Sequence, residues 1–244
     1  MAETGRDTSR DEERDSNLAA MRALEALMAP LGAGGTPLVL SGPLLRGASA
    51  AGIERIQRFR DAQYRERLSY MLSPEQLQID WRLQLDERSA HFGASWGERL
   101  VGGLRITPAP FEFHALAGSL AELAPRFRGY AEFSRLVVDP DARGAYVTPR
   151  LLVAACTWAM QEGYVGIVGL CRRAARTMFE RYGLTAASEE QHHVPLRGPQ
   201  PYTLMMGTWP QLIAASTRLT QRLNRLRSKE ASEAYAPLAE VEQT

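Results

Sequence analysis

An apolar segment that passes through a short turn into a helix start constrains the fold of this chain more than any other feature. Residues 131–139 have the apolar pattern of a strand, residues 140–147 read as a loop, and residues 149–162 as a helix. Thr148 suits the N-cap of that helix, and Pro149 suits its first position. A strand that feeds a helix N-terminus in this way commonly holds an anion, because the first turn has free amides and a partial positive charge.

The segments on either side predict one mixed α/β (α+β) domain with a single open sheet. Ala90–Trp96 and Leu100–Ile106 predict two antiparallel strands joined by a tight turn. Residues 49–72 have the apolar spacing of an amphipathic helix. The other predicted elements are helices at 18–30, 114–127, 172–182 and 209–229, and strands at 38–40, 165–170 and 202–207. Residues 81–85 alternate like a strand or the entry to a turn.

Composition sets the domain limits and excludes several classes of protein. Residues 1–16 are polar and predict a disordered tail, residues 17–230 predict the folded domain, and residues 231–244 predict a flexible tail. The net charge of +1 gives no overall attraction for nucleic acid or a membrane surface, and no apolar run is long enough to span a bilayer. Cys156 and Cys171 form no disulfide framework, so we expect a cytoplasmic protein.

The central stretch carries a resemblance to a known family. Glu132-x-Ser134-Arg135, followed by Arg143-Gly144 and a helix start at Thr148, resembles the core of the GNAT acyltransferase superfamily. The Glu-x-Ser-Arg version resembles acyl-homoserine-lactone synthases and the FeeM-type N-acyl amino acid synthases. The resemblance covers roughly residues 53–185, and upstream it includes the residues Arg60, Tyr64, Asp86, His91 and Arg105.

The resemblance implies a GNAT-like single domain, whose central sheet is mixed, mostly antiparallel and splayed between two strands, with helices on its flanks. It also implies a thioester donor whose phosphopantetheine arm binds at the splay, where free backbone groups can pair with the amides of the arm. A carboxylate must then accept the proton of the attacking amine, and Glu132 is the candidate base, with Arg105 and Arg135 ordering the site. The implied donor-binding residues are Leu136, Val137, Val138, Arg143, Gly144, Ala145, Tyr146, Val147 and Thr148, and the implied substrate-binding residues are Arg60, Tyr64, Asp86, His91 and Ser134.

Two departures from the superfamily pattern bear on the donor and on the chemistry. Tyr146 and Thr148 occupy positions where acetyl-CoA enzymes have small residues, and side chains there crowd the approach to a pyrophosphate. The loop therefore favours the single phosphodiester of an acyl carrier protein over coenzyme A. Phe179 stands where the superfamily often has a tyrosine acid, so we expect no general acid at that position. A thiolate is a good enough leaving group to need little acid assistance.

Simpler interpretations of the same residues remain open. Glu132 can be a catalytic base or can brace the sheet through an ion pair with Arg105 or Arg135. Cys171 reads as a packing thiol, and His192-His193 lacks partners at metal-ligand spacing, so we expect no metal site. The basic face of the last helix is either solvated or receives an acidic carrier protein; it includes Arg218, Arg222, Arg225 and Arg227.

The preferred hypothesis is an N-acyltransferase that moves a medium or long fatty acyl group from an acyl carrier protein to an amine of an amino acid or a peptide side chain. No permanently bound cofactor, nucleic-acid partner or stable membrane insertion is expected. Three alternatives remain: an acyl-homoserine-lactone synthase, an acyl-CoA or acetyl-CoA-dependent GNAT acetyltransferase, and a non-catalytic module that binds an acyl carrier protein or a lipid.

Overall fold

The structure is a computed structural model that describes residues 8–28, 37–47, 49–142 and 146–235. Its α-helices are α1 (Thr8–Met28), α2 (Ala50–Arg67), α3 (Pro74–Arg82), α4 (Gly118–Leu123), α5 (Val147–Gln161), α6 (Arg173–Arg181) and α7 (Trp209–Tyr235). Its strands are β1 (Leu38–Leu44), β2 (Ala90–Trp96), β3 (Arg99–Thr107), β4 (Tyr130–Val138), β5 (Gly166–Arg172), β6 (Thr185–Ala186) and β7 (Tyr202–Thr208).

The strands form one seven-stranded sheet in the order β1-β2-β3-β4-β5-β7-β6. All neighbouring pairs are antiparallel except β4 and β5, which run parallel. Pairing between β4 and β5 is recorded for residues 130–132 with residues 166–168, although both strands continue beyond that point. The two strands therefore separate after Glu132. The predicted mixed α/β fold, with a mostly antiparallel sheet splayed between two strands, is confirmed.

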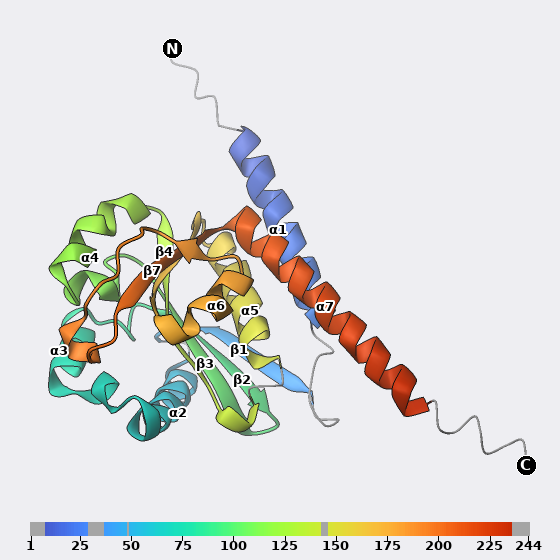
Figure 1. Cartoon of the computed structure of the whole chain (residues 1–244), viewed down its shortest axis with the longest axis horizontal. Coiled ribbons are helices and arrows are strands. Elements are labelled where there is room, and N and C mark those ends of the chain that lie inside the picture. The colour runs from blue at the N-terminus through green and yellow to red at the C-terminus, as the bar shows by residue number, and fades with distance from the viewer. Residues whose placement is uncertain (1–7, 29–36, 48, 143–145, 236–244) are drawn as a thin grey trace, which may run out of the picture.

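Helices cover both faces of the sheet. A Cβ atom at Gly102 of β3 would meet Val147 and Leu151 of α5, whereas one at Gly103 would meet Ile56 of α2. Successive residues of a strand point to opposite faces, so α5 and α2 lie on opposite sides of the sheet. Figure 1 shows α1 and α7 side by side on the α5 side of the molecule, and both contact α5. None of the helices in the described segments combines the length and the apolarity needed to cross a bilayer.

The helical content exceeds the prediction at both ends of the chain. Residues 8–16, predicted as part of a disordered tail, form the start of α1, and residues 231–235 form the end of α7. Residues 10–16 are exposed, so burial does not hold them. Arginine and glutamate are good helix formers, and they extend a helix whose later turns pack against α5 and α7.

In the middle of the chain the structure decides one open prediction and corrects another. Residues 81–85, predicted as a strand or a turn entry, are the end of α3 and a turn. Ser73 caps α3 by accepting a hydrogen bond from the Gln76 amide at 3.2 Å. The predicted helix at 114–127 is broken into short segments, α4 and two 3-10 helices, because Gly118 and Pro125 interrupt it. Thr148 is not the N-cap of α5; that position is Tyr146, in the left-handed region with φ 61°.

Candidate active site

Glu132 lies at the point where β4 and β5 separate, and its side chain is buried, with 2% of the residue exposed. Its carboxylate accepts hydrogen bonds from the backbone amides of Glu112 at 2.5 Å and Phe113 at 3.3 Å. These amides open the 3-10 helix η2 (Glu112–Ala115), so they lack partners within the helix. Burial and the neighbouring Glu112 carboxylate raise the pKa of Glu132 to about 7.

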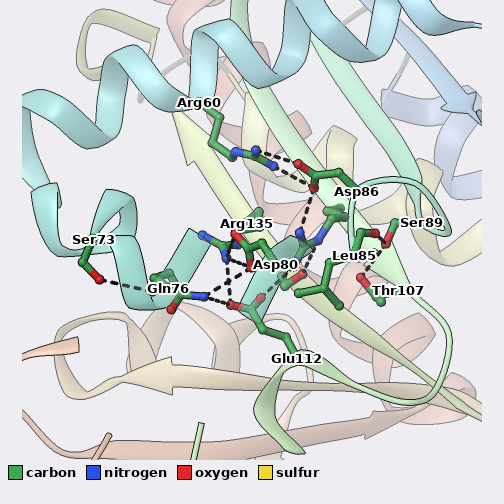
Figure 2. A network of polar contacts seen from close by, with 12 residues as sticks. Arg60, Ser73, Gln76, Asp80, Leu85, Asp86, Ser89, Thr107, Glu112 and Arg135 are labelled. Carbon is green, nitrogen blue, oxygen red and sulfur yellow. Dashed lines mark hydrogen bonds and ion pairs between the residues drawn. The ribbon is translucent and has the colours of Figure 1, made fainter. Parts of the chain in front are cut away.

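A chain of ion pairs includes Arg60, Asp86 and Glu112 (Figure 2), and the backbone amide of Glu112 donates to Glu132. Arg60 of α2 donates two hydrogen bonds to Asp86, at 2.8 and 3.0 Å. Arg105 of β3 donates to the same carboxylate at 2.8 Å and to Glu112 at 2.7 Å. Burial alone would raise the pKa of Asp86, but Arg105 and Arg60 hold it well below its usual range. The network therefore ties α2 to the middle of the sheet with groups that stay ionised.

Glu112 is the hub of this network. Its carboxylate accepts hydrogen bonds from Arg105, Arg135 and Arg197, and from the Gln76 side chain at 3.2 Å. Burial alone would raise the pKa of Glu112, but Arg135, Arg197 and Arg105 lower it to about 2. A carboxylate with three guanidinium partners stays negative, and it keeps the field near Glu132 unfavourable to a second negative charge.

Arg135 has an unusual backbone and spare donors. Its φ is 57°, in the left-handed region, and the pairing of β3 with β4 shifts register beside it, which marks a bulge. One terminal nitrogen, Nη2, bonds Asp80 at 2.8 Å and Glu112 at 2.8 Å, and the guanidinium lies 5.9 Å from the Tyr64 ring centroid. The buried Nε has no hydrogen-bond partner among the described residues. A strained residue with an unused donor is typical of a binding site.

A cavity of about 180 Å³ lies between the separated strands. The polar residues that line it are Tyr64, Tyr70, Ser134, Arg135, Arg172, Arg197 and Tyr202. The apolar residues that line it, with one cysteine, are Leu68, Met71, Phe133, Leu136, Leu170, Cys171, Ala175, Met178 and Phe179. Burial raises the pKa of the Cys171 thiol to about 12, so it is protonated and serves as packing surface.

Most of the predicted site residues meet in this region. Ser134 accepts a hydrogen bond from Arg105 Nε at 3.2 Å and lines the cavity. His91 is buried, and its Nε2 lies 2.9 Å from the Asp86 carbonyl oxygen. It therefore contacts the backbone of a network residue and does not line the cavity. Burial lowers the pKa of His91. In the described part of the chain, Glu132 forms no ion pair with Arg105 or Arg135, which was one of the two interpretations from sequence.

The predicted phosphate-binding segment is described in part. Leu136 lines the cavity, Val137 packs against Tyr64 and Met71, and residues 143–145 lie outside the described residues, so the predictions for Arg143, Gly144 and Ala145 stay predictions. Among the described residues, no side chain caps the start of α5, and no acidic residue occupies its first turn. The first amides of α5 can therefore receive an anion.

Four residues of the network were not predicted from the sequence: Gln76, Asp80, Glu112 and Arg197. Three of them make hydrogen bonds or ion pairs to Glu112 or Arg135. A signal existed for Gln76 and Asp80, because Ser73-Pro74 is a helix start, which would have placed both on one face four residues apart. Glu112 and Arg197 lie in short helical turns without a periodic pattern.

Comparisons with known proteins point to one family. The family model of the N-acyl amino acid synthase FeeM matches residues 55–207. The solved structure of FeeM, from uncultured soil microbes, is similar with 16% identity and a TM-score of 0.53, covering 76% of this chain and 98% of that one. The CoA-dependent acyl-homoserine lactone synthase BjaI is similar with 18% identity and a TM-score of 0.53, covering 75% and 89%.

An acyl-CoA N-acyltransferase from Pseudomonas aeruginosa shares 14% identity with a TM-score of 0.50, over 71% of this chain and 100% of that one. At these identities the likenesses establish the fold. A search of curated protein sequences gave no significant match.

Proposed function

Because the chain belongs to the FeeM family of N-acyl amino acid synthases, we propose that it moves a medium- or long-chain fatty acyl group from an acyl-carrier-protein thioester to an amine. The acceptor amine is that of an amino acid or of a peptide side chain. The family and the fold make the protein an amide-forming acyltransferase. In this reaction a carbon–nitrogen bond forms, the carbon–sulfur bond breaks, and the amine must lose a proton.

The observation that carries the proposal is the position and ionisation of Glu132. It lies where β4 and β5 separate, and its pKa of about 7 suits a group that takes a proton near neutral pH. Four arginines, Arg60, Arg105, Arg135 and Arg197, pair with four carboxylates, Asp61, Asp80, Asp86 and Glu112, in the network beside it. In the proposal Glu132 accepts the amine proton, and Arg105 and Arg135 fix the surrounding groups.

The edge of β4 supports the placement of the donor arm. Beyond Glu132, no pairing with β5 is recorded, so the backbone groups of residues 134–138 on that side are open to an added strand-like ligand. The arm would run along Leu136, Val137 and Val138 toward the uncapped start of α5, where its phosphate would meet free amides. Val147 and Thr148 form the first turn of that helix.

Two exposed arginines at the cavity wall and at the start of α6 favour a carrier protein as the donor. Arg172, at the cavity wall, and Arg173, at the first position of α6, are exposed, and neither makes an ion pair among the described residues. Positive charge at a helix N-terminus is unfavourable for the helix, so these arginines are better explained by an anionic partner than by stability. Tyr146 also keeps a side chain in the loop where a pyrophosphate needs close backbone approach.

The acceptor side of the proposal rests on groups that face the cavity. Tyr64, Ser134 and Arg135 line it and can offer polar groups to the acceptor. Arg60, Asp86 and His91, which the family resemblance places with the substrate, are held in the network behind this wall. We assign them the role of positioning residues.

The test is a reaction of purified protein with acyl carrier protein, charged with octanoyl or dodecanoyl groups, and a mixture of amino acids. Mass spectrometry would detect the acyl-amide product. Parallel reactions with acyl-CoA at equal concentration separate the two donors, since a carrier-dependent enzyme gives much less product from acyl-CoA. Tight binding of the carrier without product from any donor would favour a non-catalytic binding module instead.

An acyl-homoserine lactone synthase is the second candidate, because BjaI aligns with this chain as well as FeeM does. That activity needs S-adenosylmethionine and closure of a lactone ring. Product analysis with and without S-adenosylmethionine distinguishes the two, since the preferred function forms an amide in its absence.

A further inference from the structure

Two aromatic rings in contact form part of the wall of the cavity between β4 and β5. Phe133 of β4 and Phe179 of α6 meet edge to face, with ring centroids 5.7 Å apart and planes at 83°. Both rings line the cavity, and both belong to the buried core on the α5 side of the sheet. That core also includes Met205 and Leu212, so a chain that enters the cavity cannot pass between the rings without displacing packed side chains.

Phe179 is held there by its helix. Ala175, Met178 and Phe179 lie at positions i, i+3 and i+4 of α6, and all three face the cavity. Phe179 is 9% exposed, and the turn after it closes at Gly183. The ring therefore cannot swing away to solvent as an exposed side chain could, and its position defines the length of the apolar space.

The volume of the cavity limits the length of the acyl chain that it can hold. An apolar cavity of about 150 Å³ accommodates benzene, so a space of this kind holds about six to eight carbon atoms. The cavity has a volume of about 180 Å³, and polar side chains line part of it. The apolar space is therefore no larger than one that holds about six to eight carbon atoms. We infer that Phe179 limits the acyl-binding space and that the protein selects acyl groups of up to about six to eight carbons, the short end of the proposed range. This inference rests on the proposed acyl transfer and names its substrate more narrowly.

The inference can be tested without turnover. S-alkyl phosphopantetheine thioethers with 4, 6, 8, 12 and 16 carbons cannot transfer their chain, so calorimetry measures binding alone. For the wild type, affinity should rise to the hexyl or octyl ligand and then stop rising or fall. In Phe179→Ala, the lost ring frees room for about six carbon atoms, and the optimum should move to decyl or dodecyl.

Matched variants keep the result interpretable. Phe179→Tyr retains the ring and should not lengthen the optimum, whereas Phe179→Leu, a milder change that serves if the alanine variant does not fold, should lengthen it by about two carbons. Transfer assays with acyl carrier proteins of the same chain lengths should follow the same order, with at least about tenfold lower kcat/KM for hexadecanoyl than for octanoyl in the wild type.

Two results would overturn the inference: tightest binding of the hexadecyl ligand by the wild type, or the same length profile in all three Phe179 variants. Failure of the proposed function is a separate outcome, in which the ligands bind in the expected order but no acyl donor gives an amide.

Discussion

Replacing Glu132 by glutamine separates its catalytic role from its role in stability. In the folded protein the pKa of Glu132 is about 7, raised from 4.5. Between pH 4.5 and 7 the folded protein keeps a proton that the unfolded chain has lost, so stability falls as pH rises through this window. A rise of the pKa from 4.5 to about 7 corresponds to a loss of about 3 kcal/mol in the free energy of unfolding, complete above pH 7.

Glutamine carries no charge, so this pH-dependent loss disappears in Glu132→Gln. Its amide group can accept only one of the two hydrogen bonds from Glu112 and Phe113, and the donor left unpaired costs about 1–3 kcal/mol at every pH. The variant should therefore be less stable than the wild type at pH 5 and similar or more stable at pH 8. Urea unfolding at both pH values measures this, with the exposed Glu122→Gln as the control that shows no such crossover.

The pH dependence of activity should be opposite to that of stability. If Glu132 accepts the amine proton, kcat/KM of the wild type rises with pH up to about 7 and then levels, and Glu132→Gln loses about 10²–10⁴-fold. Acyl-amide formation followed by mass spectrometry from pH 5.5 to 8.5 gives both values. Full activity in the glutamine variant would refute the base assignment. Lost activity without the stability crossover would mean that Glu132 acts without a raised pKa.

Two further predictions concern the sheet and the donor. Gly169→Ala should lower the free energy of unfolding by about 1–3 kcal/mol, because a Cβ atom there collides with the backbone oxygen of Phe133. The control Gly118→Ala, with open space around it, should raise the free energy of unfolding slightly or leave it unchanged. Equal denaturation midpoints for the two variants would contradict the close approach of β4 and β5. Arg173→Glu should raise KM for an acyl carrier protein about tenfold and leave KM for acyl-pantetheine unchanged. The control Arg222→Glu on α7 should leave both KM values unchanged. An equal effect of the two charge-reversal variants would mean that the carrier protein binds elsewhere.

The local parts of the fold could be predicted because the chain carries their physical signals. The hairpin at residues 90–107 follows from apolar segments on either side of Gly97, which has φ 54°. The β4–α5 unit follows from an apolar strand and a helix start, and Glu132 could be placed at its beginning. The cap of α5 was wrong by two residues, because the helix begins at Val147 and its preceding residue, Tyr146, adopts a left-handed conformation that nothing in its residue type favours.

The charge network could be predicted only in part. Arg60, Asp86 and Arg105 were identified through the family resemblance, but their mutual pairing depends on α2 crossing the sheet, which is a property of the packed structure. Glu112 and Arg197 are charged residues in short turns, and such residues are usually exposed. Only the tertiary contacts bury them together.

The most direct test of the central claim measures two products in one reaction. Purified protein is mixed with octanoyl acyl carrier protein and an amino acid acceptor, and the released carrier thiol and the octanoyl amide are both quantified over time. The account predicts equal amounts of thiol and amide, formed together and at a much lower rate in Glu132→Gln. Thiol release without amide, or neither product from carrier-protein or coenzyme A donors, would contradict it.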